Sequence, residues 1–166
     1  MKNPPIKTTL LFLFLSSALL TGLQGASTQL PPTPSKYVTD NASVLKANTA
    51  DRLSGQLAEF YHRTGNELII VINPNLPKGV SIGEYAQQLY EGWKIGQPGK
   101  DTGALLLICT QDHQGRIHTG RGLANKLTED VCKKIFIDTI APRLDAGDYD
   151  GACKAGAQAL IEAMSR

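Results

Sequence analysis

The sequence predicts an α/β fold in which helices cover both faces of a mixed β-sheet. Two runs, at residues 67–73 and 104–110, have the length and the aliphatic content of buried strands. Such strands need cover on both faces, and segments of helical periodicity alternate with them along the chain. A shorter run at 116–119 follows the second strand after a turn, which indicates a hairpin. The pattern leaves the position of a fourth strand open.

The first predicted helix covers residues 45–63. Asn48 or Thr49 can cap its N-terminus, and Gly65 marks its end. Its apolar side chains recur at helical spacing on one face: Leu53, Leu57, Phe60 and Tyr61.

The second predicted helix begins after Ser81. Glu84 follows three residues later, which is the pattern of a capping box. The inner face of this helix carries Ile82, Tyr85, Ala86, Leu89 and Trp93.

Two further helices complete the predicted fold. Thr128 caps a third helix that we expect to run to about residue 140 and to stop before Pro142. Its inward side chains are Val131, Cys132, Ile135, Phe136 and Ile140. Asp148 opens the last helix, on which Ala157, Leu160 and Met164 share a face.

Residues 1–26 have the pattern of a signal peptide. Lys2 and Lys7 precede an uncharged segment whose apolar core, residues 10–20, is shorter than the ~18 residues that span a bilayer. The small residues that follow form a weak cleavage site, so an uncleaved membrane anchor is the alternative. We therefore expect an exported protein, periplasmic or extracellular, which is tethered to the membrane only if the signal is retained.

The segment that follows contains Pro31, Pro32 and Pro34, which predict a stiff linker over residues 27–35. The folded domain is expected to cover residues 36–166. No second long apolar run follows residues 1–26, so we expect no C-terminal membrane helix.

The charge balance restricts the partners of the protein. The formal net charge is +2, and Lys2 and Lys7 of the leader account for this excess. A neutral remainder lacks the basic surface that nucleic acids or anionic membranes require. The expected partner is an unidentified envelope or membrane protein.

The chain has three cysteines, Cys109, Cys132 and Cys153. In an exported protein an odd number indicates one disulfide and one free thiol. A bridge between Cys132 and Cys153 is one alternative. The other is that both are free, since both lie early on helices that would keep them apart if antiparallel. Cys109 lies inside a predicted strand and is interpreted as a core residue.

Motifs of serine hydrolases, nucleotide-binding loops, zinc proteases and redox cysteine pairs are absent from the sequence. The residues with chemical potential are carboxylates in or beside loops: Asp40, Asp101, Glu129 and Asp130. Such oxygen ligands suit Ca²⁺ and Mg²⁺. The alternative is that they form turns or complement a helix dipole.

Two other polar clusters are weaker indications of a site. Arg121 lies between Gly120 and Gly122, and a lone pair of glycines is little evidence for a phosphate cradle. The acids Asp145, Asp148 and Asp150 lack the full calcium-loop pattern, and we interpret them as a turn and a helix cap.

The motifs, taken together, resemble those of the TPM domain family, which includes the thylakoid-lumen acid phosphatase and bacterial relatives. The resemblance covers residues 36–164. The matching pieces are, in order, Tyr37-Val38-Thr39-Asp40, Trp93-Lys94-Ile95-Gly96, Lys100-Asp101-Thr102-Gly103, Gly120-Arg121-Gly122-Leu123 and Gly147-Asp148-Tyr149-Asp150-Gly151.

This resemblance implies an α/β/α sandwich with a mixed, about four-stranded sheet. It also implies an acidic pocket that binds a divalent cation in some members, and a weak acid phosphatase activity in the plant branch, which is linked to photosystem II repair. Asp40 and Asp101 match acidic positions of the family, and Glu129 or Asp130 falls at or next to another. Ala124 stands where the family usually has Glu, so any Ca²⁺ or Mg²⁺ site is expected to be weakened.

Three functions follow as hypotheses. The favoured one is an exported interaction or accessory module in envelope or membrane-protein maintenance. The second is a metal-assisted phosphomonoesterase, in which Asp40 and Asp101 hold a cation and Arg121 stabilises the transferring charge. The sequence offers no nucleophile or general acid for that scheme. The third is a divalent-cation-binding domain without chemistry.

Overall fold

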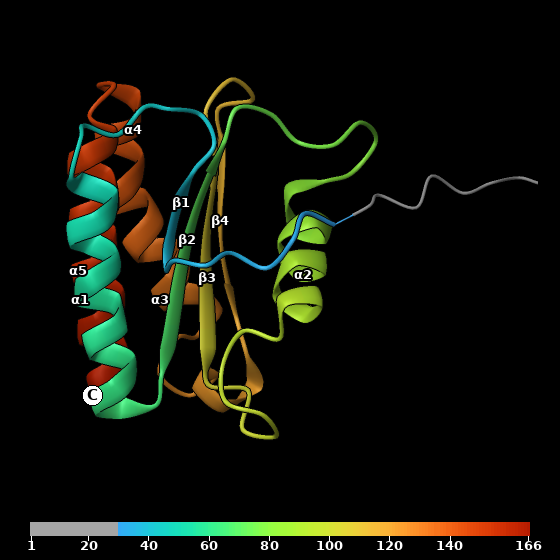
Figure 1. Cartoon of the computed structure of the whole chain (residues 1–166), viewed down its shortest axis with the longest axis vertical. Coiled ribbons are helices and arrows are strands. Elements are labelled where there is room, and N and C mark those ends of the chain that lie inside the picture. The colour runs from blue at the N-terminus through green and yellow to red at the C-terminus, as the bar shows by residue number, and fades with distance from the viewer. Residues whose placement is uncertain (1–29) are drawn as a thin grey trace, which may run out of the picture.

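A computed structural model describes residues 30–166, and the predicted signal peptide lies outside the described residues. Four strands lie between two layers of helices (Figure 1). The elements are, in order, β1 (Val38–Asp40), α1 (Thr49–Thr64), β2 (Glu67–Asn73), α2 (Ile82–Trp93), β3 (Gly103–Cys109), β4 (Gln114–Thr119), the 3₁₀ helix η1 (Arg121–Leu123), α3 (Glu129–Ile135), the π-helix η2 (Phe136–Ile140), α4 (Ala141–Asp145) and α5 (Tyr149–Ser165).

The sheet has the strand order β1-β2-β3-β4. The first three strands are parallel, and β4 is antiparallel to β3, so the sheet is mixed as predicted. The fourth strand that the pattern could not place is β1. It has three residues, too few for a period-two pattern, and it pairs Val38 with Ile70 at the edge of the sheet.

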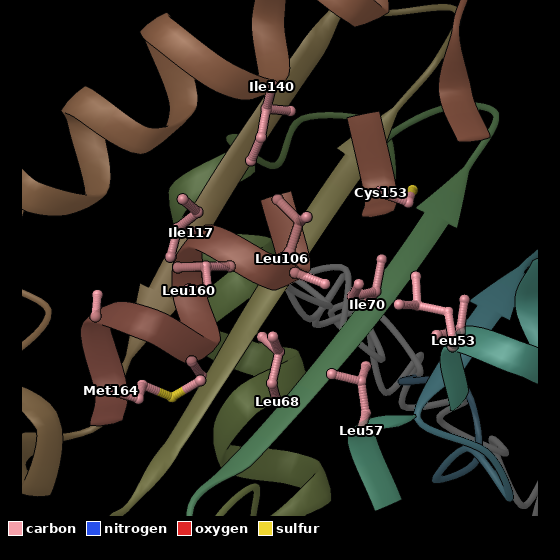
Figure 2. Packing of buried hydrophobic residues seen from close by; sticks show 14 of the residues in the cluster. Leu53, Leu57, Leu68, Ile70, Leu106, Ile117, Ile140, Cys153, Leu160 and Met164 are labelled. Atoms are coloured by element: carbon pink, nitrogen blue, oxygen red, sulfur yellow. The ribbon is translucent and has the colours of Figure 1, made fainter. Parts of the chain in front are cut away.

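The core is divided by the sheet into two clusters. On one face, side chains of α1, α3 and α5 pack against alternate residues of β2 and β3, among them Leu68, Ile70 and Leu106 (Figure 2). On the other face, α2 covers the remaining positions, such as Ile69 and Leu105 (Figure 1). Both central strands are therefore buried on two sides, as their aliphatic composition predicted.

The ends of α1 and α2 follow from local hydrogen bonds. The capping box of Ser81 and Glu84 is present at the start of α2, as predicted. Gly65 ends α1 with φ at +72°, also as predicted. However, α1 begins at Thr49 rather than near residue 45, because side chains hold the preceding turn: the Leu45 amide donates to Asp40 and the Lys46 amide donates to Asp150.

The helix predicted from Thr128 continues to Ile140 but does not stop before Pro142, so that part of the prediction was wrong. After Ile135 the chain forms one π-helical segment, η2, and then α4, which has Pro142 in its first turn. A proline is tolerated there because its missing N–H needs no partner in the first turn of a helix. Ile137, within the π-helical segment, is 53% exposed.

The described part of the proline-rich segment packs on the domain instead of extending from it as a linker. The Trp93 indole donates a hydrogen bond of 2.9 Å to the Pro31 carbonyl, and Leu30 packs against the core cluster under α2. From there the segment crosses the sheet to β1 (Figure 1).

All three cysteines are buried and free, so Cys132 and Cys153 do not form a disulfide in this structure. Burial raises the pKa of Cys109 to about 11 and that of Cys153 to about 12, which makes both thiols poor nucleophiles. Within residues 30–166 no helix combines the length and apolar character that crossing a membrane requires.

Candidate functional site

Asp40, the last residue of β1, has its carboxylate engaged by the chain that follows it. One carboxylate oxygen accepts the Leu45 amide at 2.8 Å, and the other accepts the Ala42 amide at 3.2 Å. Asp40 thus organises the turn between β1 and α1, the structural role that was the alternative to metal binding.

Asp101 lies in the loop before β3 and forms an ion pair with Arg121. The guanidinium Nη2 is 2.9 Å from the Asp101 carboxylate, and Nε also donates to it at 3.0 Å. The Arg121 side chain is 95% exposed and that of Asp101 is 38% exposed, so the pair contributes only about 0–1 kcal/mol to stability. The Asp101 backbone has φ at +51°, an uncommon conformation for a non-glycine residue.

The glycines beside Arg121 allow two loops to pack closely. A Cβ atom at Gly120 would collide with the Tyr90 hydroxyl and the Asp101 carbonyl, and one at Gly122 would collide with the Lys100 carbonyl. The Gly122 amide donates to the Asp101 carbonyl at 3.0 Å. Backbone packing therefore accounts for both glycines without a bound phosphate.

The structure places Asp40 and Asp101 at opposite ends of the parallel strands. Asp40 pairs with Ile72, which pairs with Ile108 of β3. Asp101 precedes Gly103, the first residue of β3, and Gly103 is five residues before Ile108. At about 3.3 Å per residue these two levels of the sheet are about 17 Å apart.

The predicted acidic residues therefore do not form one cation site. Glu129 and Asp130 are exposed at the start of α3, where they lie in the first turn of the helix. No group of three or more His, Cys, Asp or Glu side chains in residues 30–166 is arranged to hold a metal ion. The Ca²⁺ or Mg²⁺ site implied by the resemblance does not fit these donors, because Asp40 is engaged by amides and Asp101 by Arg121.

We predict that titration of Ca²⁺ or Mg²⁺ into the protein gives the same heat in the wild type and in Asp101→Ala. The physical reason is that a single exposed carboxylate without a second acidic ligand beside it binds these ions only weakly. Isothermal titration calorimetry measures this. Saturable millimolar or tighter binding that disappears in Asp101→Ala would contradict the prediction.

A groove of about 530 Å³ lies elsewhere, between β4 and the helical segment formed by α3 and η2. We call it the β4 groove. Gly115–Thr119 form its strand side, and its other lining residues are Leu127, Glu129, Cys132, Lys133, Phe136 and Ile137. The sequence did not indicate this groove, because its lining combines β4 with residues of α3 and η2 that are brought together only by the tertiary fold.

Backbone groups of β4 point into the β4 groove. Gly120 lies directly opposite Gly103 at the end of the ladder between β3 and β4. The Gly120 amide donates to the Gly103 carbonyl, so this is a hydrogen-bonded pair. In an antiparallel ladder the hydrogen-bonded pairs alternate, so His118 and Arg116 bond to β3 while Gly115, Ile117 and Thr119 point away from it. No loop or helix backbone in the described chain bonds to these outward groups.

We predict that amide hydrogen exchange alternates along β4. The Ile117 and Thr119 amides should exchange at least about tenfold faster than those of Arg116 and His118, which donate to β3. Residue-resolved exchange measured by NMR tests this. Equal protection along the strand would mean that the edge of β4 already has a partner.

The charges around the groove are mainly basic. Arg116 and Lys133 form no ion pair with any residue of 30–166, and Glu129 is the acidic residue of the lining. The His118 ring packs against Tyr90 with ring centroids 4.9 Å apart and the ring planes tilted by 49°. Burial, together with the Arg116 charge, lowers the pKa of His118, so this side chain is neutral near pH 7.

Comparison with known proteins identifies related sequences and folds. A family model described as the TPM domain matches residues 38–163. A comparison with curated protein sequences finds no match. Three solution structures are similar in fold.

The N-terminal domain of a protein from P. gingivalis shares 23% identity over 78% of this chain and 82% of that chain, with a TM-score of 0.70. The N-terminal domain of the cg2496 protein from Corynebacterium glutamicum shares 14% identity over 81% and 83%, with a TM-score of 0.61. The BA42 protein from the psychrophilic bacterium Bizionia argentinensis shares 14% identity over 73% and 81%, with a TM-score of 0.60. At these identities the likeness concerns the fold alone.

Proposed function

Because this chain belongs to the TPM domain family, we propose that it is an exported interaction module of that family. It serves the maintenance of envelope or membrane proteins by binding a partner protein. The observation that carries this proposal is the β4 groove, which combines free strand backbone, unpaired basic side chains and the exposed Ile137. A free strand edge is a template for pairing with another chain.

Export is supported by the leader, residues 1–26, which has the charge, apolar core and length of a signal peptide. Fractionation of cells and N-terminal sequencing of the purified protein test this part. A mature N-terminus near residue 27 is expected in the periplasm or the medium. An intact leader in the membrane fraction would support the anchor instead.

The alternative function is a weak metal-assisted acid phosphatase. Arg121 beside Asp101 is the arrangement that favours it, because an exposed guanidinium can bind a phosphate. Our proposal expects hydrolysis of para-nitrophenyl phosphate to be at background level with and without Mg²⁺ or Ca²⁺. Activity that is lost in both Asp101→Ala and Arg121→Ala would favour the alternative.

Photo-crosslinking in living cells tests the interaction module directly. A photoreactive amino acid replaces Ile137 in the groove, and the matched control carries it at Gln158, an exposed position on α5. We expect a defined adduct with an envelope protein from position 137 and none from position 158. The same yield from both positions, or no adduct from 137, would contradict the proposed function.

A further inference from the structure

We propose, on the basis of the function above, that the β4 groove binds an extended segment of the partner protein as a fifth strand. The segment alternates apolar and acidic residues. The proposal rests on the free edge of β4, the side chains on its two faces, and the charge of the groove.

The backbone of β4 supplies the first argument. The N–H and C=O groups of Gly115, Ile117 and Thr119 point away from β3 and have no backbone partner outside the sheet in the described chain. They repeat every second residue, which is the spacing of the groups on an added strand. An extended peptide satisfies them without any change in the sheet.

The side chains beside the edge supply the second argument. Gly115, Ile117 and Thr119 pair with Ile108, Leu106 and Ala104, which belong to the core on the α1 side of the sheet. On that side the groove ends at Phe136 and Ile137, and Ile137 is the large hydrophobic residue that is exposed in the described chain. Alternate side chains of an added strand would face these two residues, so those side chains should be apolar.

Charge supplies the third argument. Arg116 lies on the opposite side of β4, facing the α2 side of the sheet, because it pairs with Leu107 of the core there. The other set of alternate side chains on an added strand would lie beside it. Arg116 has no carboxylate partner within residues 30–166, so acidic side chains on this side of the added strand complement its charge.

A second copy of this chain is a less suitable occupant. Two β4 strands paired about a twofold axis would place the Arg116 side chains of the copies near each other at the middle of the strands, and like charges in such pairs repel. Arg116 also resembles the charged residues that protect sheet edges from pairing.

Fluorescence anisotropy with the full chain tests the inference. The probe is a fluorescein-labelled synthetic peptide in which valine and glutamate alternate, and the control probe has lysine in place of glutamate. Three variants report on the three arguments: Thr119→Pro removes an outward N–H without removing a bond to β3, Arg116→Glu reverses the charge, and Ile137→Ser removes the exposed apolar side chain. Arg52→Glu, on the exposed face of α1, is the matched control for the charge reversal.

We expect saturable binding of the glutamate probe and weaker or no binding of the lysine probe. Each of the three groove variants should weaken binding about tenfold, while Arg52→Glu leaves it unchanged. Arg116→Glu and Ile137→Ser change exposed side chains, so they keep the test valid if Thr119→Pro unfolds.

No binding of the glutamate probe, equal binding of both probes, or binding that the groove variants leave unchanged would overturn the inference. A dimer in sedimentation that Arg116→Ala strengthens, because the like charges are removed, would also overturn it, in favour of a second copy. Adducts from position 137 in cells together with no peptide binding would leave the proposed function standing and reject this class of partner.

Discussion

Replacing Gly120 by alanine is expected to lower the free energy of unfolding by about 2–4 kcal/mol. The added Cβ would overlap with the Tyr90 hydroxyl and with the Asp101 carbonyl, and the latter is backbone that moves only with its loop. Tyr90 itself is 8% exposed and has little room to shift. Urea denaturation followed by circular dichroism measures the change.

Gly55→Ala is the matched control, because Gly55 lies in α1 and a Cβ there meets no atom within 4 Å. Alanine in a helix is favoured over glycine by about 0.5–1 kcal/mol, so this variant should be more stable than the wild type. If Gly120→Ala were as stable as the wild type, the loop would not need its glycine for packing, and a phosphate cradle would become the better explanation.

Asp150→Asn is expected to lower the free energy of unfolding by about 2 kcal/mol at neutral pH. Asp150 is 7% exposed in the first turn of α5, and its carboxylate accepts the Lys46 amide just before the start of α1 at 3.3 Å. It therefore joins the N-termini of two helices that are distant in the sequence. Asp145→Asn is the control, because Asp145 is exposed and its side chain accepts no hydrogen bond from any residue of 30–166.

The effect of Asp150 should depend on pH in a defined direction. The Thr49 hydroxyl, with the Lys46 amide and nearby lysines, holds the pKa of Asp150 below its ordinary value. A carboxylate with a lowered pKa stabilises the fold above the unfolded pKa of about 3.9, and this stabilisation is lost as the pH falls through the folded pKa. The difference in the free energy of unfolding between wild type and Asp150→Asn should thus be largest at about pH 7 and should disappear near pH 2. A difference that stays constant with pH would contradict this assignment.

The strands and caps with strong local signals could be predicted from the sequence. The run 67–73 forms β2 with the predicted bounds, and the capping box at Ser81 is present. Asp148, interpreted as a helix cap, accepts the Gly151 amide at the start of α5. These features depend on interactions within a few residues, which a local pattern contains.

The features that depend on distant residues could not be predicted. β1 has three residues and is held by its pairing with β2, so its own composition carries little signal. Without β1 in place, the sequence could not show that Asp40 ends a strand whereas Asp101 precedes one, which places them at opposite ends of the parallel strands. The packing of Phe136 over Gly115, beside the β4 groove, is also a non-local contact.

NMR mapping on the purified protein tests the central claim most directly, namely that the β4 groove and not the acidic loops is the binding site. Amide spectra are recorded with the valine–glutamate peptide and, separately, with CaCl₂. The account predicts peptide-induced shifts at residues 115–119 and 133–137, and no saturable Ca²⁺-induced shifts at residues 40–45 or 100–103. Saturable shifts confined to the two acidic loops, with β4 unchanged, would contradict it.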